Sequence, residues 1–395
     1  MKICGIITEY NPFHNGHALH IQRAREISGC EYIIACMSGN FVQRGEPAIF
    51  DKFIRTKAAL QNGADVVIEL PVFFAAQSAE YFAAYSVRLL EATGIIDSIC
   101  FGSECGDLPA LLAIAELLAF ESQALSSEIK KLSAAGYPYP KARAEALSAI
   151  HPTQLLGSPN NILGIEYLKA ILKTGSNITP LTVKRENAMY NDMKITGNIA
   201  SATAIRGAIA HENYDAVGLS VPADCFDLYK SQKPVFPDDF SELLHLRLRT
   251  LDRAELPGIF EIKEGIENKI LSAAEEFDNL TQIAQAVKSR RYPLTAIMRM
   301  LQNILLDIKK EEVISHFASD CQYIRVLGFK KQSAALPLLV KSSKVPVITS
   351  VKEMRRLSGA GQDMLAKEIN ATNLYDYVRG EKRINREYRE PVVVV

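Results

Sequence analysis

The sequence predicts an α/β fold in which a doubly wound parallel sheet is followed by a mainly α-helical, basic C-terminal region. Apolar runs alternate with amphipathic stretches over the first hundred residues, which is typical of strand–helix–strand units with right-handed crossovers. Beyond residue 221 the apolar spacing is helical. The 395 residues are 48% hydrophobic and 23% charged, which excludes a wholly disordered chain and a disulfide scaffold.

The elements of the sheet follow in chain order. Four apolar runs predict strands over residues 2–8, 32–38, 66–70 and 98–102. The amphipathic stretches between them predict helices over residues 17–28, 52–62 and 79–93. An Ala- and Leu-rich stretch over about 108–150 predicts a helical insertion, after which 178–184 returns as a strand and 200–210 as a helix. Such sheets bind ligands at the carboxyl ends of their strands, so the loops there are the expected site.

A domain boundary is expected where Val221 precedes Pro222. It separates residues 1–221, which hold the sheet, from residues 222–395. Helices are expected in the second part over residues 239–250, 263–277, 294–310 and 362–377. The last residues, 391–395, form an edge strand or a frayed end.

The formal net charge of zero hides an uneven distribution. Residues 285–395 contain 20 Lys and Arg against 11 Asp and Glu, a charge of +9, and the preceding 284 residues carry −9. A basic region fits a polyanionic partner, and a solvated helical face explains it equally well.

The sequence favours a cytoplasmic protein that does not enter a membrane. Its apolar runs are too short to cross a bilayer, and residues 3–8 are too short for the apolar region of a signal peptide. The seven cysteines are scattered without a C-x-x-C pair, as expected of reduced core residues.

The loop after the first strand carries the strongest chemical signal. The segment Glu9-Tyr-Asn-Pro-Phe-His-Asn-Gly-His17 places His14 and His17 three positions apart at the start of a helix. Backbone N–H groups at a helix start attract anions, and Gly16 has no side chain to hold a ligand away. Two imidazoles there can donate hydrogen bonds to phosphate oxygens as charge develops in a transition state. This corner therefore suits adenylyl transfer.

Metal binding is the alternative interpretation of these histidines. Zinc needs further Cys or His ligands at suitable spacing, and beyond His20 none is near in the sequence. Only a ligand from a distant part of the chain would complete such a site, so we assign no metal ligand.

The segment His14-Asn-Gly-His17 resembles the H-x-G-H signature of the nucleotidyltransferase superfamily, which includes the class I aminoacyl-tRNA synthetases. That superfamily carries a late motif of the form I-S-S-T-x-x-R. Residues 200–206 keep Ser201, Thr203 and Arg206 of this motif, with alanines at its isoleucine and second serine. The resemblance implies a HIGH-type, Rossmann-like nucleotidyltransferase domain in which Arg206 clamps phosphate oxygens with its planar fork.

Five segments in order more specifically resemble the bacterial tRNA(Met) cytidine acetate ligases. They are residues 9–17, 37–47, 64–71, 101–104 and 288–293. The resemblance implies that acetate is activated by ATP to acetyl-adenylate and that acetyl then passes to N4 of the wobble cytidine of elongator tRNA(Met), forming N4-acetylcytidine. It also implies that residues 1–221 are the ATP-binding catalytic domain and residues 222–395 the tRNA-binding region. Mg²⁺ is expected to accompany the ATP, and no protein partner is implied.

The functional residues of that family carry over onto the matching positions. The implied catalytic residues are His14, His17 and Arg206. The implied ATP contacts are Ile7, Thr8, Glu9, Tyr10, Asn11, Pro12, Phe13, His14, Asn15, Gly16, His17, Ala18, Leu19, His20, Gly102, Asn161, Arg185, Ser201 and Thr203. Packing of the loop explains Pro12 and Phe13 as well.

Basic residues around Tyr292 are the candidates for tRNA binding. Cations position RNA phosphates, and an aromatic ring stacks on an unstacked base. The candidates are Lys288, Arg290, Arg291, Tyr292 and Arg299. A solvated helix start explains any single one of them equally well.

Polar residues also follow the second and third strands. One group either closes over the substrate or turns the chain: Ser38, Gly39, Gln43, Arg44 and Glu46. Asp65 fits a cap at the start of the third strand. Glu69, at its far end, fits a partner of Mg²⁺ or of an arginine.

Two rival functions stay open at this level. One is adenylyl transfer to a small phosphorylated cofactor precursor, which would leave the basic region without a role. The other is RNA binding without catalysis, which would leave the paired histidines unexplained.

Overall fold

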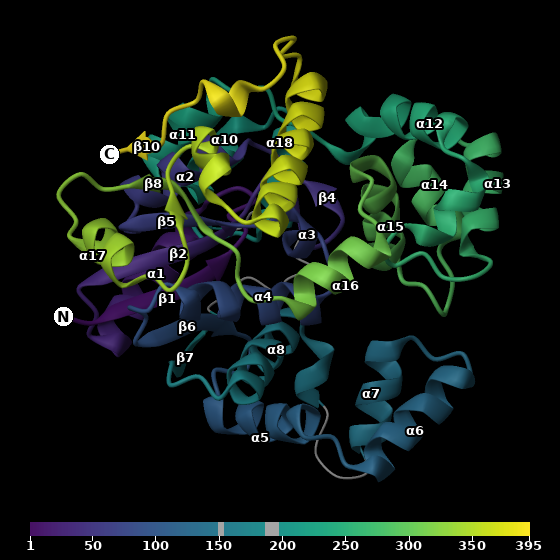
Figure 1. Ribbon diagram of the computed structural model, residues 1–395, viewed down its shortest axis with the longest axis horizontal. Coiled ribbons are helices and arrows are strands. Elements are labelled where there is room, and N and C mark those ends of the chain that lie inside the picture. The colour runs from purple at the N-terminus through teal and green to yellow at the C-terminus, as the bar shows by residue number, and fades with distance from the viewer. Residues whose placement is uncertain (149–153, 186–196) are drawn as a thin grey trace.

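A mixed central sheet forms the centre of the molecule. The computed structural model describes residues 1–148, 154–185 and 197–395 (Figure 1). Within them the sheet runs in the order β10-β8-β5-β2-β1-β6-β7, with a short β9 paired to β8. The strands are β1 Ile3–Thr8, β2 Tyr32–Ser38, β5 Val66–Leu70, β6 Ser98–Ser103, β7 Thr179–Lys184, β8 Ile324–Phe329, β9 Val347–Ile348 and β10 Val393–Val394. The five strands from β5 to β7 are parallel, and their bounds match the prediction within one residue.

Alternate side chains of the strands pack into two cores, one on each face of the sheet. In β2, Ile33 and Ala35 belong to one core, and Ile34 and Cys36 belong to the other. The first core is covered by α1 Asn15–Ser28, α2 Lys52–Gln61 and α9 Ala202–Ala210. The second is covered by α4 Ala79–Ala92, α5 Leu108–Ala119 and α8 Pro159–Thr174. Helices on both faces confirm the doubly wound α/β fold.

The strand order reverses at β1. From β1 the chain moves outward to β2 and β5, and it returns to the other side of β1 to form β6 and β7. Such a reversal opens a crevice at the carboxyl ends of the strands. The first turn of α1 follows the end of β1 and lies at this crevice.

The helical insertion expected after β6 is present and extends along the bottom of Figure 1 to the lower right. It comprises α5, α6 Gln123–Ala134 and α7 Tyr139–Ser148, and the last expected positions, 149 and 150, lie outside the described residues. After η1 Gln154–Gly157, α8 packs beside α5. Among the described residues no single helix is long and apolar enough to span a membrane, and one pair, α5 with α6, passes that test only together, across an 85° bend.

The C-terminal region is mainly helical, as predicted. After α10 Tyr214–Ser220, which ends just before Val221, its helices are α11 Ala223–Lys230, η2 Pro237–Phe240, α12 Ser241–Thr250, η3 Arg253–Gly258, α13 Ile266–Glu276, α14 Leu280–Val287, α15 Leu294–Leu306, α16 Lys310–Ala318, α17 Ala335–Ser342, η4 Val351–Arg356, α18 Gly359–Arg379 and η5 Arg386–Tyr388. The single helix expected over 294–310 is wrong. α15 ends at Leu306 because Asp307 takes a left-handed backbone conformation, with φ of 51°.

Two strands of the C-terminal region, β8 and β10, extend the central sheet. The sequence did not indicate β8, whereas an edge strand was one of the two forms expected for residues 391–395. β8 pairs antiparallel with β5, and β10 pairs parallel with β8. The strand pattern of β8 is concealed by Arg325 and Gly328, which interrupt its apolar run. The final residues are therefore an edge strand, and the domain boundary at Val221 stays a prediction.

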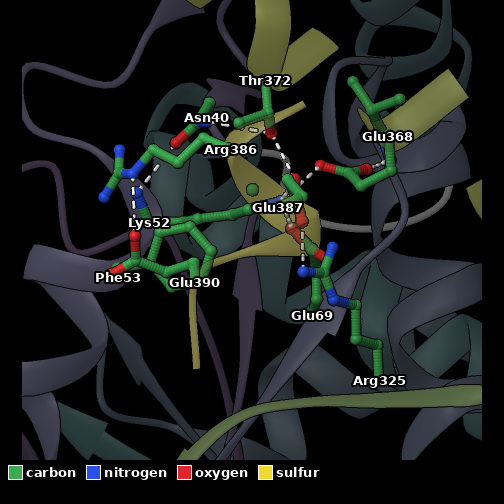
Figure 2. Close-up of polar contacts among 12 residues, drawn as sticks. Asn40, Lys52, Phe53, Glu69, Arg325, Glu368, Thr372, Arg386, Glu387 and Glu390 are labelled. Atoms are coloured by element: carbon green, nitrogen blue, oxygen red, sulfur yellow. Dashed lines mark hydrogen bonds and ion pairs between the residues drawn. The ribbon is translucent and has the colours of Figure 1, made fainter. Parts of the chain in front are cut away.

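A buried charge network joins β8 and α18 to the sheet, and Figure 2 shows its members converging: Lys52, Glu69, Arg325, Glu368 and Glu387. Glu69 lies 2.6 Å from Lys52 Nζ and 2.8 Å from a terminal nitrogen of Arg325. Glu387 pairs with the same two cations, and Glu368 lies 3.4 Å from Lys52 Nζ. Of the two partners expected for Glu69, the structure shows the arginine. Asp65 accepts the N–H of Ile33 at 2.8 Å, as a strand cap does.

Candidate active site

A cavity of about 450 Å³ lies at the carboxyl ends of β1, β6 and β7. Its walls include most of the residues that the sequence assigned to ATP. These are Ile7, Thr8, Glu9, Tyr10, Asn11, His14, Gly16, His17, Leu19, His20, Gly102, Arg185, Ser201, Thr203 and Arg206. The first loop, the β6 end and the late motif, far apart in sequence, therefore meet around one space.

The two histidines of the motif are locked together at the start of α1. His14 is the N-cap, and its Nδ1 accepts the backbone N–H of Gly16 at 3.1 Å. The backbone N–H of His14 donates in turn to His17 Nδ1 at 3.3 Å, and the two rings stack with centroids 3.7 Å apart. Because both Nδ1 atoms accept, each neutral ring carries its proton on Nε2. Each ring therefore keeps one N–H donor for a ligand.

Gly16 is required by this arrangement. A Cβ at this position would lie 2.9 Å from Cε1 of His14. Any larger residue would push the His14 ring out of the N-cap position, so the glycine serves the capping histidine as well as access to the backbone.

The three histidines of the first helix are held neutral. Burial, with Arg185 and Arg206 nearby, lowers the pKa of His14 to about 3. Burial and then the His14 ring lower the pKa of His17, and burial with Arg185 lowers the pKa of His20 to about 4. The imidazoles thus act as hydrogen-bond donors, and the positive charge of the cavity comes from its arginines and Lys184.

The late motif places Arg206 against the first loop. Ser201 caps α9 by accepting the N–H of Ala204 at 3.0 Å, which fixes the start of the helix. Arg206 donates from one terminal nitrogen to the carbonyl of Asn11 at 2.9 Å. Its other terminal nitrogen lies 3.6 Å from a carboxylate oxygen of Glu46. A guanidinium held at one end in this way can present its remaining N–H groups to phosphate oxygens.

Arg185 lies over the end of β6. A Cβ at Gly102 would come within 3.3 Å of Cγ of Arg185, so the glycine lets this side chain lie flat against the strand end. Burial lowers the pKa of Arg185, and Glu104 opposes that shift. The neighbouring residues 186–196 lie outside the described residues.

Five residues expected to contact ATP do not line the cavity: Pro12, Phe13, Asn15, Ala18 and Asn161. Phe13 is fully buried against Tyr10, so it packs the loop. The Asn15 side chain donates to the carbonyls of Asn198 and Leu219.

Asn161 supports the cavity wall from behind. Its Oδ1 accepts the N–H groups of Glu104 at 2.9 Å and Cys105 at 3.2 Å, and its neighbour Asn160 lines the cavity instead. An ATP contact of Asn161 stays a prediction.

The polar loop after β2 forms the opposite wall. It is a hairpin of β3 Phe41–Val42 and β4 Glu46–Pro47, and Gln43, Arg44 and Glu46 line the cavity. The N–H of Gln43 donates to a carboxylate oxygen of Glu9 at 2.8 Å, and burial raises the pKa of Glu9. Ser38 and Gly39 instead lie behind the wall, where their carbonyls accept hydrogen bonds from Arg55.

Sequence reasoning missed several residues of the cavity. Ser78 and Phe82 come from the start of α4, Tyr167 from α8, and Pro293 and Thr295 from the start of α15. Apart from Pro293, which ends the segment 288–293, none belongs to a motif. The packing of α4, α8 and α15 beside the first loop brings them here, and nothing adjacent to them in the sequence indicates that packing.

The basic segment predicted to bind tRNA adjoins the cavity through the start of α15. The guanidinium of Arg290 lies 5.0 Å from the ring centre of Tyr137 in the helical insertion, and that of Arg291 lies 5.5 Å from the ring of Tyr292. Arg299, one turn into α15, lines the cavity itself. RNA contacts of these residues stay predictions.

The described residues hold no cluster of three or more His, Cys, Asp or Glu side chains arranged to bind a metal ion. Both cavity carboxylates lie close to arginines, Glu46 at 3.6 Å from Arg206 and Glu9 beside Arg44.

Comparison with known proteins agrees with the family resemblance found in the sequence. Residues 1–390 match the family model of the HIGH Nucleotidyl Transferases. A protein of Acetivibrio thermocellus named tRNA(Met) cytidine acetate ligase is 40% identical over 95% of this chain and 94% of its own. One of the same name from Thermoanaerobacter is 42% identical over 95% of both chains.

A solved structure shares the whole fold. Thermotoga maritima TmcAL, determined with bound alpha-thio ATP, superposes with a TM-score of 0.93 over 100% of both chains at 32% identity. Its ligand-free form gives a TM-score of 0.95. The chain therefore belongs to the HIGH nucleotidyltransferases and, among them, to the tRNA(Met) cytidine acetate ligases.

Proposed function

We propose that this chain is an ATP-dependent ligase that acetylates N4 of the wobble cytidine of elongator tRNA(Met). The observation that carries the proposal is the cavity, because the paired histidines and the start of α15, next to the basic segment, line the same space. Full-length similarity to proteins named tRNA(Met) cytidine acetate ligase supports the choice of substrate.

The first step would form acetyl-adenylate. A carboxylate oxygen of acetate attacks the α-phosphorus of ATP, the bond to the bridging oxygen breaks, and pyrophosphate leaves. The Nε2–H groups of His14 and His17 donate to the phosphate oxygens as charge develops, and Arg206 supplies positive charge. The protein contributes position and electrostatics without a covalent nucleophile.

The second step would transfer acetyl to RNA. The N4 amine of the cytidine attacks the carbonyl carbon of acetyl-adenylate, AMP leaves, and the nitrogen loses a proton. The cytidine has to leave its base stack to reach the cavity, and the basic segment 288–293 would hold the flanking phosphates. Its connection to the cavity through Pro293 and Thr295 supports this path.

Mg²⁺ would reach the site with the triphosphate. The cavity carboxylates Glu9 and Glu46 have arginines beside them, so the ion would be held chiefly by phosphate oxygens and water, as Mg²⁺ commonly is. It would supply charge neutralisation for the leaving pyrophosphate. Acetate as substrate, action without a protein partner and a cytoplasmic location are parts of the same proposal.

A labelling experiment tests the function. The protein is incubated with ATP and radiolabelled acetate, with and without tRNA(Met). We expect acetyl-adenylate and pyrophosphate without RNA, and label on the tRNA when RNA is added. Turnover of ATP that ignores acetate would favour a cofactor adenylyltransferase, and no turnover would favour RNA binding alone.

A further inference from the structure

Arg299 occupies a place that RNA binding on an outer face does not explain. It belongs to α15, yet its side chain lines the catalytic cavity and is only 12% exposed. A cation that binds RNA phosphates on an outer surface is expected to face solvent, whereas this one is largely withdrawn from it.

The guanidinium of Arg299 is held in place through its Nε atom. Its Nε donates to both carboxylate oxygens of Glu261, at 3.0 and 2.9 Å. Glu261 takes a left-handed backbone conformation, with φ of 64°, which is strained for a residue with a side chain. Among the described residues, none accepts a hydrogen bond from the two terminal nitrogens of Arg299. The fork that usually binds an oxyanion is thus left available.

The backbone of Arg299 is packed against the hairpin that forms a cavity wall. Gly45, with φ of 79°, lies so close that a Cβ there would come within 2.3 Å of the Arg299 backbone nitrogen. The same hairpin supplies Gln43, Arg44 and Glu46 to the cavity. Arg299 is therefore tied to the β2 side of the cavity, whereas Gly102 and Arg185 lie at the ends of β6 and β7.

The start of α4 also favours an anion in the cavity. Ser78 and Ala79 line the cavity, and no side chain caps this helix. Unpaired N–H groups at a helix start favour a negative charge nearby, so this end of α4 also suits an anion in the cavity.

We propose that Arg299 binds an oxyanion of the adenylation step, either the carboxylate of acetate or a phosphate of ATP, with Glu261 as its positioning residue. The inference rests on the proposed function and deepens it. It makes Arg299 necessary before any RNA arrives, so residues 222–395 contribute to the chemistry of the small substrates.

Acetate-dependent ATP–pyrophosphate exchange without tRNA tests this proposal. The variants are Arg299→Gln and Arg299→Lys, the second of which keeps the charge and the alkyl packing. We expect exchange at subsaturating substrate to fall at least tenfold in Arg299→Gln, and less in Arg299→Lys. A raised KM for acetate identifies the carboxylate as the ligand, and a raised KM for ATP or pyrophosphate identifies a phosphate.

A matched variant controls for the loss of one positive charge. Arg249→Gln removes a cation from α12, where Arg249 is exposed and does not line the cavity, and its exchange should equal that of the wild type. Wild-type exchange in folded Arg299→Gln, with or without loss of tRNA acetylation, would overturn the proposal. Wild-type protein that exchanges without acetate would instead contradict the proposed function, so the two failures are distinguishable.

Discussion

At the scale of single residues, the paired imidazoles carry the clearest prediction. His17 accepts a backbone N–H through Nδ1 and offers Nε2–H to the cavity. Replacement His17→Ala should slow acetate-dependent ATP–pyrophosphate exchange by about 10²–10³-fold, the usual cost of a preorganised donor. The melting temperature serves as the control for folding, and unchanged exchange would refute the role.

The protonation of these rings is a second prediction. With the pKa of His14 near 3 and that of His20 near 4, neither should gain a proton between pH 8 and 5.5. The unfolded chain does gain protons there, since free imidazole titrates near 6.5, so these groups should lower the free energy of unfolding as the pH falls below about 6.5. Imidazole chemical shifts in NMR spectra check the first statement, and a His14 signal that titrates near 6.5 would contradict it.

Some residues of the site could be predicted from the sequence around them, and others could not. The His14–His17 corner was predictable because a strand, a glycine and a helix start are adjacent in the chain. Phe82 and Tyr167 were not, because their place in the cavity depends on how α4 and α8 pack over the sheet. The position of Asn161 behind the wall depends on hydrogen bonds to Glu104 and Cys105, which no motif encodes.

At the scale of elements, the buried charge network decides how the C-terminal strands and helices join the sheet. It contains three carboxylates and two cations, so one carboxylate has no countercharge. Burial, together with the neighbouring Glu69, raises the pKa of Glu368 to about 8, which identifies it as the protonated member. Burial opposes the charge on Glu387, but Arg325 and Lys52 lower its pKa to about 2.

A matched pair of amide substitutions tests this division. Glu368→Gln imitates a carboxyl group that is already neutral and keeps an oxygen for the N–H of Val72, which donates at 2.8 Å. It should change the free energy of unfolding little near pH 4, where the glutamate of the unfolded chain also holds its proton. Glu387→Gln removes a charge that two buried cations need, and should cost about 3–5 kcal/mol. Urea unfolding measures both, and equal losses would show that Glu368 is ionised.

The raised pKa of Glu368 also predicts how the free energy of unfolding depends on pH. A carboxyl group whose folded pKa is raised above its unfolded value holds its proton better in the folded state, so stability declines as the pH rises from about 4.5 to about 8. Glu368→Gln abolishes this decline. At pH 9 the variant should therefore be more stable than the wild type, and a wild-type lead at pH 9 would contradict the assignment.

Elements were predictable where their pattern is local. β2 and β5 were placed to the residue because strands buried on both faces read as continuous apolar runs. β8 was not, because its Arg325 is buried by pairing with Glu69 and Glu387, residues far away in the chain. A sequence pattern assigns a cation to the surface unless the acidic residues that pair with it in the fold are known.

At the scale of the whole molecule, the excess positive charge of the last third should set the affinity for RNA. Replacing Arg290 and Arg291 together by glutamate should weaken tRNA binding and flatten the dependence of log K on log salt concentration, because fewer counterions are released. Filter binding over a range of salt concentrations measures both quantities.

The control for that variant is Lys57→Glu. Lys57 is exposed on α2, which packs beside β8 and lies at the left of Figure 1, whereas α15 lies at the right. Its reversal should leave the salt dependence of tRNA binding as in the wild type. An unchanged salt slope in the double variant would mean that the basic segment does not contact phosphates.

The antiparallel pairing of β8 with β5 has a consequence for biosynthesis. Arg325 follows its partner Glu69 by 256 positions, which a ribosome needs roughly 13–50 s to add. Throughout that interval the nascent chain carries an open strand edge at β5, and Glu69 has Lys52 but lacks Arg325, the second of its two cations. Truncated products that end before residue 324 should therefore be the ones that aggregate or recruit chaperones.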